Sequence, residues 1–92
     1  MEKKAKGNFV VQNDKGLHTR PSTELVKCAA GFNCQIHLTY RNYVVNAKSL
    51  LGILMLAAEK GARIKIEAIG DDAKEAISAL QRLAMHGFNI KY

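Results

Sequence analysis

The chain has 92 residues, of which 48% are hydrophobic and 24% are charged, an ordinary composition for a soluble globular domain. Its longest apolar run, residues 50–58, is far shorter than the ~20 residues of a membrane helix, and no apolar secretory core follows the charged N-terminal residues. We therefore expect one cytoplasmic domain over residues 1–92. The net charge of +6 suits an anionic partner, but the basic residues are too scattered to form an RNA-binding tract.

The first expected elements are a short strand and an amphipathic helix. The sequence NFVVQN at residues 8–13 predicts a strand, and Asp-Lys-Gly at residues 14–16 is typical of a turn. Pro21 favours a helix start, because the first helical turn does not need its missing N–H. Apolar residues follow at helical spacing, and Gly31 is expected to end the helix in the left-handed conformation.

The middle of the chain predicts a hairpin followed by a second helix. Residues 34–39 alternate between apolar and polar side chains, which indicates a strand. A turn at residues 40–42 and a returning strand at residues 43–46 complete the hairpin. Residues 48–58 predict a short helix that is apolar on almost every side.

The last elements are a strand, a helix and a short tail. Residues 62–69 alternate again, and either Asp71 or Asp72 is expected to cap a helix whose apolar residues recur at helical spacing. Gly87 would end this helix, and residues 88–92 would form the tail. The order β-α-β-β-α-β-α predicts a two-layer α/β sandwich with an antiparallel or mixed sheet.

The sequence Gly-Leu-His-Thr-Arg-Pro, at residues 16–21, lies between the first strand and the first helix. It places His18 at a helix N-terminus, where unpaired amides and the positive end of the helix dipole favour an anion. An imidazole has an unperturbed pKa of about 6.5, so a neutral, nucleophilic nitrogen is abundant at physiological pH. Arg20 can neutralise phosphoryl oxygens with its forked donors. His18 is therefore the candidate phosphoryl acceptor; the alternative is a solvated loop histidine.

This segment and a second one, Asn-Ala-Lys-Ser-Leu-Leu-Gly at residues 46–52, resemble the two motifs of HPr. HPr is the family of histidine-containing phosphocarriers of the bacterial phosphotransferase system. The order and spacing of the expected elements agree with this family over residues 7–86. The resemblance implies an α+β open-faced sandwich, in which three helices cover one face of a four-stranded antiparallel sheet of order 1-4-2-3.

The resemblance also implies the activity, which is that of a phosphoryl carrier and not of a turnover enzyme. The Nδ1 atom of His18 would accept a phosphoryl group from enzyme I, which phosphoenolpyruvate charges. The carrier would then pass the group to sugar-specific enzyme IIA proteins. Arg20 matches the family arginine that stabilises the phosphohistidine.

Ser49, in the second motif, matches the serine that HPr kinase/phosphorylase phosphorylates in the family. A phosphate at this helix start would lie near backbone amides and Lys48. Its charge of about minus two would also repel acidic partners and slow transfer at His18. The alternative is a helix-capping serine that is never modified.

The second expected helix is also the docking surface that the resemblance implies. A one-sided sandwich cannot bury every face of so apolar a helix, and contiguous exposed apolar surface marks binding sites. The expected partner-contacting residues are Thr19, Lys48, Leu50, Leu51 and Leu54. The expected core residues of the helix are Ile53, Met55 and Leu56.

Two other functions stay open at this point. A sibling carrier of a nitrogen-regulating or metabolic phosphorelay would use the same chemistry with different partners. A nucleic-acid-binding module would need aromatic stacking residues on a sheet face or a Gly-x-x-Gly clamp, and the sequence has neither.

Cys28 and Cys34 make neither a disulfide framework nor a zinc motif. We therefore expect a monomer with no metal, cofactor or nucleic acid.

Overall fold

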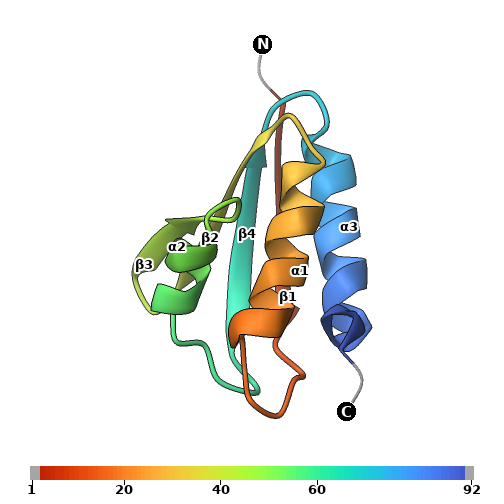
Figure 1. The fold of residues 1–92 in the computed structure, drawn as a ribbon. Coiled ribbons are helices and arrows are strands. Elements are labelled where there is room, and N and C mark those ends of the chain that lie inside the picture. Colours follow the sequence, from red (N-terminus) through yellow and green to blue (C-terminus); the bar gives the residue numbers. More distant parts are fainter. Residues whose placement is uncertain (1–2, 91–92) are drawn as a thin grey trace.

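The computed structural model describes residues 3–90, and these form a four-stranded sheet with helices packed on it (Figure 1). The elements in chain order are β1 (Lys4–Val10), α1 (Thr19–Ala30), β2 (Gln35–Tyr40), β3 (Tyr43–Asn46), α2 (Leu50–Met55), β4 (Arg63–Ile69), α3 (Ala73–Met85) and the short 3-10 helix η1 (Gly87–Asn89). The element order predicted from the sequence is confirmed, with η1 added after the last helix.

Every strand pair in the sheet is antiparallel, and the strand order is β1-β4-β2-β3. This is the 1-4-2-3 order that the family resemblance implied. In the register, Ile66 of β4 lies between Gly7 of β1 and Leu38 of β2. The β2–β3 hairpin turns through Arg41 and Asn42, which both have positive φ, as a two-residue type I′ turn requires.

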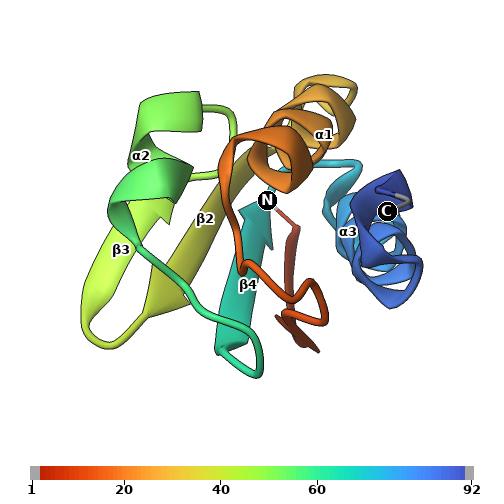
Figure 2. The ribbon, with the colours of Figure 1, turned by 60° about the horizontal axis from the view of Figure 1, so that its bottom comes forward.

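The helices cover one face of the sheet, as Figure 2 shows, and the core lies between the two layers. Leu25 of α1, Ile53 of α2 and Leu80 of α3 are completely buried and join Ile66 of β4 in one hydrophobic cluster. Side chains on the other face of the strands are exposed, such as Lys65, or half-buried, such as His37. The two-layer, open-faced sandwich is therefore confirmed. No helix within residues 3–90 is both long enough and apolar enough to cross a membrane.

The first strand and the end of the first helix differ from the sequence-based prediction. β1 pairs with β4 along the whole of Lys4–Val10, whereas the sequence predicted a strand at residues 8–13. The lysines at the start of β1 lie on the open face of the sheet, where charged side chains are tolerated. A prediction based on apolar residues alone therefore began the strand too late in the sequence. Gly31 ends α1 with a φ of −74°, so the prediction of a left-handed residue was wrong.

α2 is shorter than the predicted helix at residues 48–58. It begins after Ser49 and ends at Met55, and Ala57 has a φ of 49°, which is incompatible with a continuing helix. The apolar residues after Met55 belong instead to the segment that leads into β4. A helix prediction based on apolar content alone cannot distinguish these two structures.

The end of α3 and the residues after it form part of the core. Phe88, expected in a tail, is completely buried, and its ring meets that of Phe9 edge-on with centroids 5.8 Å apart. Gly87 has a φ of 60° and follows the end of α3, as predicted. The tail prediction was wrong for residue 88, while residues 91 and 92 lie outside the described residues.

Asp72, and not Asp71, is the residue that precedes α3, but its side chain does not cap the helix. Its carboxylate accepts hydrogen bonds from the amides of Asn33 at 2.7 Å and Cys34 at 2.9 Å. The Asn33 bond is the largest cause of a lowered Asp72 pKa. Burial, together with the neighbouring Asp72, raises the pKa of the Cys34 thiol to about 11. Both cysteines are free, as expected, and this thiol stays protonated.

Candidate functional site

The loop between β1 and α1 is held by backbone hydrogen bonds and by the conformation of Gly16. The Gly16 amide donates to the Asn13 carbonyl oxygen at 2.9 Å, which closes a turn over residues 13–16. The Leu17 amide donates to the Ala58 carbonyl oxygen, also at 2.9 Å. Gly16 has a φ of 69°, and a Cβ at this position would clash with the Ala58 oxygen. Only glycine fits here, and it fixes the backbone that leads into His18.

His18 is the N-cap residue of α1, with an extended backbone and a carbonyl oxygen that accepts from the Ser22 amide at 3.0 Å. Its position at a helix N-terminus is therefore confirmed. Pro21 is buried in the first turn, where its missing N–H costs no hydrogen bond. Ser22 is completely buried, and its hydroxyl donates to the Leu17 carbonyl oxygen at 3.0 Å. This bond ties the start of α1 back to the preceding loop.

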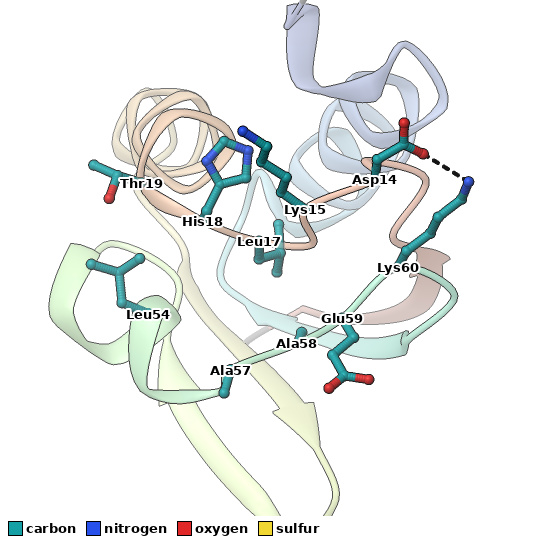
Figure 3. Close-up of a pocket in the computed structure, with 10 residues that line it drawn as sticks. All are labelled: Asp14, Lys15, Leu17, His18, Thr19, Leu54, Ala57, Ala58, Glu59 and Lys60. Atoms are coloured by element: carbon teal, nitrogen blue, oxygen red, sulfur yellow. Dashed lines mark hydrogen bonds and ion pairs between the residues drawn. The ribbon is translucent and has the colours of Figure 1, made fainter.

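His18 lies on the wall of an open pocket between two loops, shown in Figure 3. The loop before α1, the start of α1, the end of α2 and the segment leading into β4 all contribute to the pocket. The lining residues are Asp14, Lys15, Leu17, His18, Thr19, Leu54, Ala57, Ala58, Glu59 and Lys60.

The charged residues of this pocket differ in their partners and in the direction of their side chains. Lys60 Nζ lies 2.8 Å from Asp14 Oδ1, and this hydrogen bond is the largest cause of a lowered Asp14 pKa. In Figure 3 the Glu59 carboxylate points away from His18, whereas the Lys15 side chain points toward the imidazole. The sequence predicted only that Lys15 belongs to a turn. Its position three residues before His18 was the only feature of the sequence that could have assigned it to the site.

The two residues after His18 occupy different surroundings. Thr19 begins α1 and lines the pocket, and its carbonyl oxygen accepts from the Thr23 hydroxyl at 2.8 Å. Arg20 is exposed in the first turn of α1 and does not belong to the pocket lining. The structure therefore brings Thr19 to the pocket with His18, while Arg20 lies outside it.

Ser49 is the N-cap residue of α2, and its hydroxyl oxygen accepts a hydrogen bond from the Gly52 amide at 3.1 Å. The preceding Lys48 is turned toward a different part of the chain. Its Nζ donates to the Phe32 carbonyl oxygen, just after α1, at 2.7 Å. Neither Lys48 nor Ser49 lines the pocket that contains His18.

The apolar residues of α2 are divided between core, pocket and solvent. Ile53 and Leu56 are buried, as predicted, but Met55 is 71% exposed, so its assignment to the core was wrong. Leu51 is 69% exposed; it precedes Met55 by four residues and therefore lies on the same side of the helix. Leu50 is 37% exposed, and the half-buried Leu54 reaches the pocket. We call Leu50, Leu51 and Met55 the α2 apolar surface.

A metal-dependent reaction has no ligand cluster to support it in the part of the chain that the structure describes. No group of three or more His, Cys, Asp or Glu side chains within residues 3–90 could hold a metal ion. The residues around His18 are instead suited to an anion: a helix N-terminus, a lysine amine and an open solvent side.

Comparison with known proteins agrees with the fold and identifies the family. The family model described as "PTS HPr component phosphorylation site" matches residues 5–85. A multiphosphoryl transfer protein of Haemophilus influenzae is 40% identical over 84 residues. That match covers 88% of this chain but only 17% of the relative, so the chain corresponds to a small part of that protein.

Solved structures give the same result. HPr-C-His from Thermoanaerobacter tengcongensis superimposes with a TM-score of 0.90 and 38% identity, covering 96% of this chain and 99% of that one. The phosphocarrier protein HPr from Bacillus anthracis has a TM-score of 0.81 and 35% identity, covering 86% and 94%. The fold and these matches thus place the chain in a family of small open-faced sandwich phosphocarriers. The chain belongs to the HPr family of the phosphotransferase system.

Proposed function

We propose that His18 accepts a phosphoryl group from enzyme I, which phosphoenolpyruvate charges, and passes it to enzyme IIA proteins that serve sugar uptake. The observation that carries this proposal is the position of His18, at the N-cap of α1 and on the wall of an open pocket. A phosphoryl group on its Nδ1 would meet the positive end of the helix dipole. Because a phosphorus–nitrogen bond is labile, the next acceptor can take the group.

The open side of the pocket gives a donor or acceptor protein direct access to His18. Leu54 lines that pocket and belongs to the same helix as the exposed residues of the α2 apolar surface, which one partner would cover. Thr19 would contribute from the start of α1, and Lys48 from the opposite end of the docking region. Arg20, in the exposed first turn, would swing toward the phosphoryl oxygens once the group is in place.

Phosphorylation of Ser49 by HPr kinase/phosphorylase would provide the regulation. The modification would place a charge of about minus two directly beside Leu50, at the edge of the α2 apolar surface. An acidic partner would then be repelled, and transfer at His18 would slow without any change to the pocket itself.

The proposed carrier works in the cytoplasm as a monomer and is consumed and regenerated stoichiometrically, unlike an enzyme. Donor and acceptor would dock in turn, because both must reach the same pocket. No resident metal or cofactor takes part in the proposed transfer.

Intact-protein mass spectrometry after incubation with phosphoenolpyruvate and enzyme I tests this function. We expect a single adduct of about 80 Da that is lost in acid and retained in base. His18→Ala should retain its fold by circular dichroism and acquire no adduct. An acid-labile adduct on His18→Ala would contradict the proposal, and so would a wild-type protein that stays unmodified.

A further inference from the structure

The turn over residues 13–16 sends its two central side chains in different directions. Its closing bond, from the Gly16 amide to the Asn13 carbonyl oxygen, leaves Asp14 and Lys15 at the tip. In Figure 3 the Asp14 carboxylate points to Lys60, whereas the Lys15 side chain points toward His18. Lys15 is therefore positioned by the same fixed loop that positions the histidine.

Of the two lysines that line the pocket, Lys15 is the one whose side chain points toward the imidazole in Figure 3. The other lining lysine, Lys60, is engaged with Asp14 at 2.8 Å. The Glu59 carboxylate points away from the ring in Figure 3, so it does not neutralise the Lys15 amine there. The sequence predicted that Arg20 neutralises the phosphoryl oxygens, but Arg20 is not among the residues that line the pocket.

Building on the function proposed above, we propose that Lys15 is a phosphoryl-binding residue of the His18 site. A lysine ammonium offers three donors on a flexible stem and can follow the phosphoryl oxygens during transfer. The bond from phosphorus to the donor breaks as the bond from phosphorus to the His18 ring nitrogen forms. Lys15 keeps its proton throughout and contributes charge-assisted hydrogen bonds to the oxygens, which are roughly twice as strong as neutral ones.

The test compares Lys15→Gln with Lys60→Gln, which removes the same charge from the same pocket at a residue that is already paired with Asp14. Each variant is phosphorylated by two donors, enzyme I with phosphoenolpyruvate and the small molecule phosphoramidate. With phosphoramidate, the phosphorus–nitrogen bond of the donor breaks and ammonia leaves. No protein docks in that reaction, so it isolates what Lys15 does for the phosphoryl group.

We expect Lys15→Gln to slow the phosphorylation of His18 about tenfold with both donors, because a charge-assisted contact is lost at a partly exposed site. Lys15→Arg should restore most of the rate, and Lys60→Gln should stay within about twofold of wild type. Since Lys15 is exposed, the unfolding midpoint of Lys15→Gln should match that of wild type.

Three results would overturn this inference. The first is an unchanged rate in Lys15→Gln, and the second is an equal loss in Lys60→Gln, which would indicate a general field effect. The third is a loss with enzyme I alone, which would make Lys15 a docking residue. All three leave the proposed carrier function intact, because that function fails only if His18→Ala is still phosphorylated or wild type is not.

Discussion

The starts of α1 and α2 both carry a candidate phosphoryl acceptor as the N-cap residue, and they differ in what surrounds it. At α1, His18 stands on the wall of an open pocket, with Lys15 alongside and a backbone fixed by Gly16. At α2, the Ser49 hydroxyl caps its own helix by accepting from the Gly52 amide at 3.1 Å.

The neighbouring lysines show the same contrast. Lys48 donates to the Phe32 carbonyl oxygen at 2.7 Å and so serves the packing of α1 against the α2 region. Lys15 instead extends into the pocket beside the histidine. At the start of α1 the lysine points toward the candidate acceptor, whereas at the start of α2 the polar groups hold the fold. A phosphate on Ser49 would replace an existing cap, so we expect it to act on docking more than on chemistry.

The largest expected effect comes from Gly16→Ala, which changes the loop before α1 and leaves the start of α2 unaltered. The new Cβ would clash with the Ala58 oxygen at a φ of 69°, so we expect a loss of at least ~3 kcal/mol in the free energy of unfolding. Urea denaturation measures this loss. Phosphoramidate should no longer modify His18 efficiently, while Ser49 should still be modified by HPr kinase/phosphorylase if the regulation proposed above holds.

Gly61→Ala is the matched control. Gly61 also has a positive φ, of 89°, but a Cβ there would meet no atom within 4 Å. Only the conformational cost of about 1–2 kcal/mol applies. If both variants lost the same stability, the close approach of Gly16 to Ala58 would not be what fixes the loop.

A smaller effect is expected from Ser49→Ala, which removes the side-chain cap at the start of α2. Removal of the cap should cost ~1 kcal/mol in the free energy of unfolding, measured in urea, and Ser49→Thr should recover most of it. The rate at which His18 is phosphorylated by phosphoramidate should not change. A slower reaction would show that the two helix starts are coupled, contrary to the contrast drawn above.

The smallest expected effect concerns the Asp14–Lys60 pair at the edge of the pocket. Lys60 lowers the folded-state pKa of Asp14 below the unfolded value of about 3.9, so the unfolded chain binds more protons between the two values. The pair therefore stabilises the fold above the unfolded pKa, and this contribution is lost as the pH falls through the folded pKa.

Asp14→Asn should accordingly be slightly less stable than wild type at pH 7, and the two proteins should become equal in acid. Because both side chains are exposed, added salt should also shrink the difference. Thermal unfolding across pH and salt measures it. A difference that grows in acid would contradict the assigned direction.

The sequence predicted the element order and the helix-start position of His18, because both depend on local patterns. Alternation marks β2 and β4, and a glycine, a histidine and a proline at fixed spacing mark the start of α1. The strand order of the sheet came only through the resemblance to a family, and its register was not predicted, since pairing partners lie far apart in the sequence.

The sequence-based predictions were wrong where tertiary packing decides whether a side chain is buried or exposed. On α2 every side is apolar, so only the position of the six-residue helix at one edge of the core shows that Met55 is exposed while Ile53 is buried. Phe88 follows a glycine that ends α3 and looked like a tail, yet it fills the space beside Phe9. The direction of Lys15 depends on a turn closed by backbone bonds, which composition does not reveal.

Phosphorus-31 NMR of the protein after reaction with phosphoenolpyruvate and enzyme I tests the central claim most directly, namely that His18 at the start of α1 is the acceptor. We predict one resonance of the phosphorus–nitrogen type that disappears on acid treatment. It should be present in Ser49→Ala and absent in His18→Ala. A resonance of the acid-stable phosphate-ester type, or an unchanged signal in His18→Ala, would contradict this account.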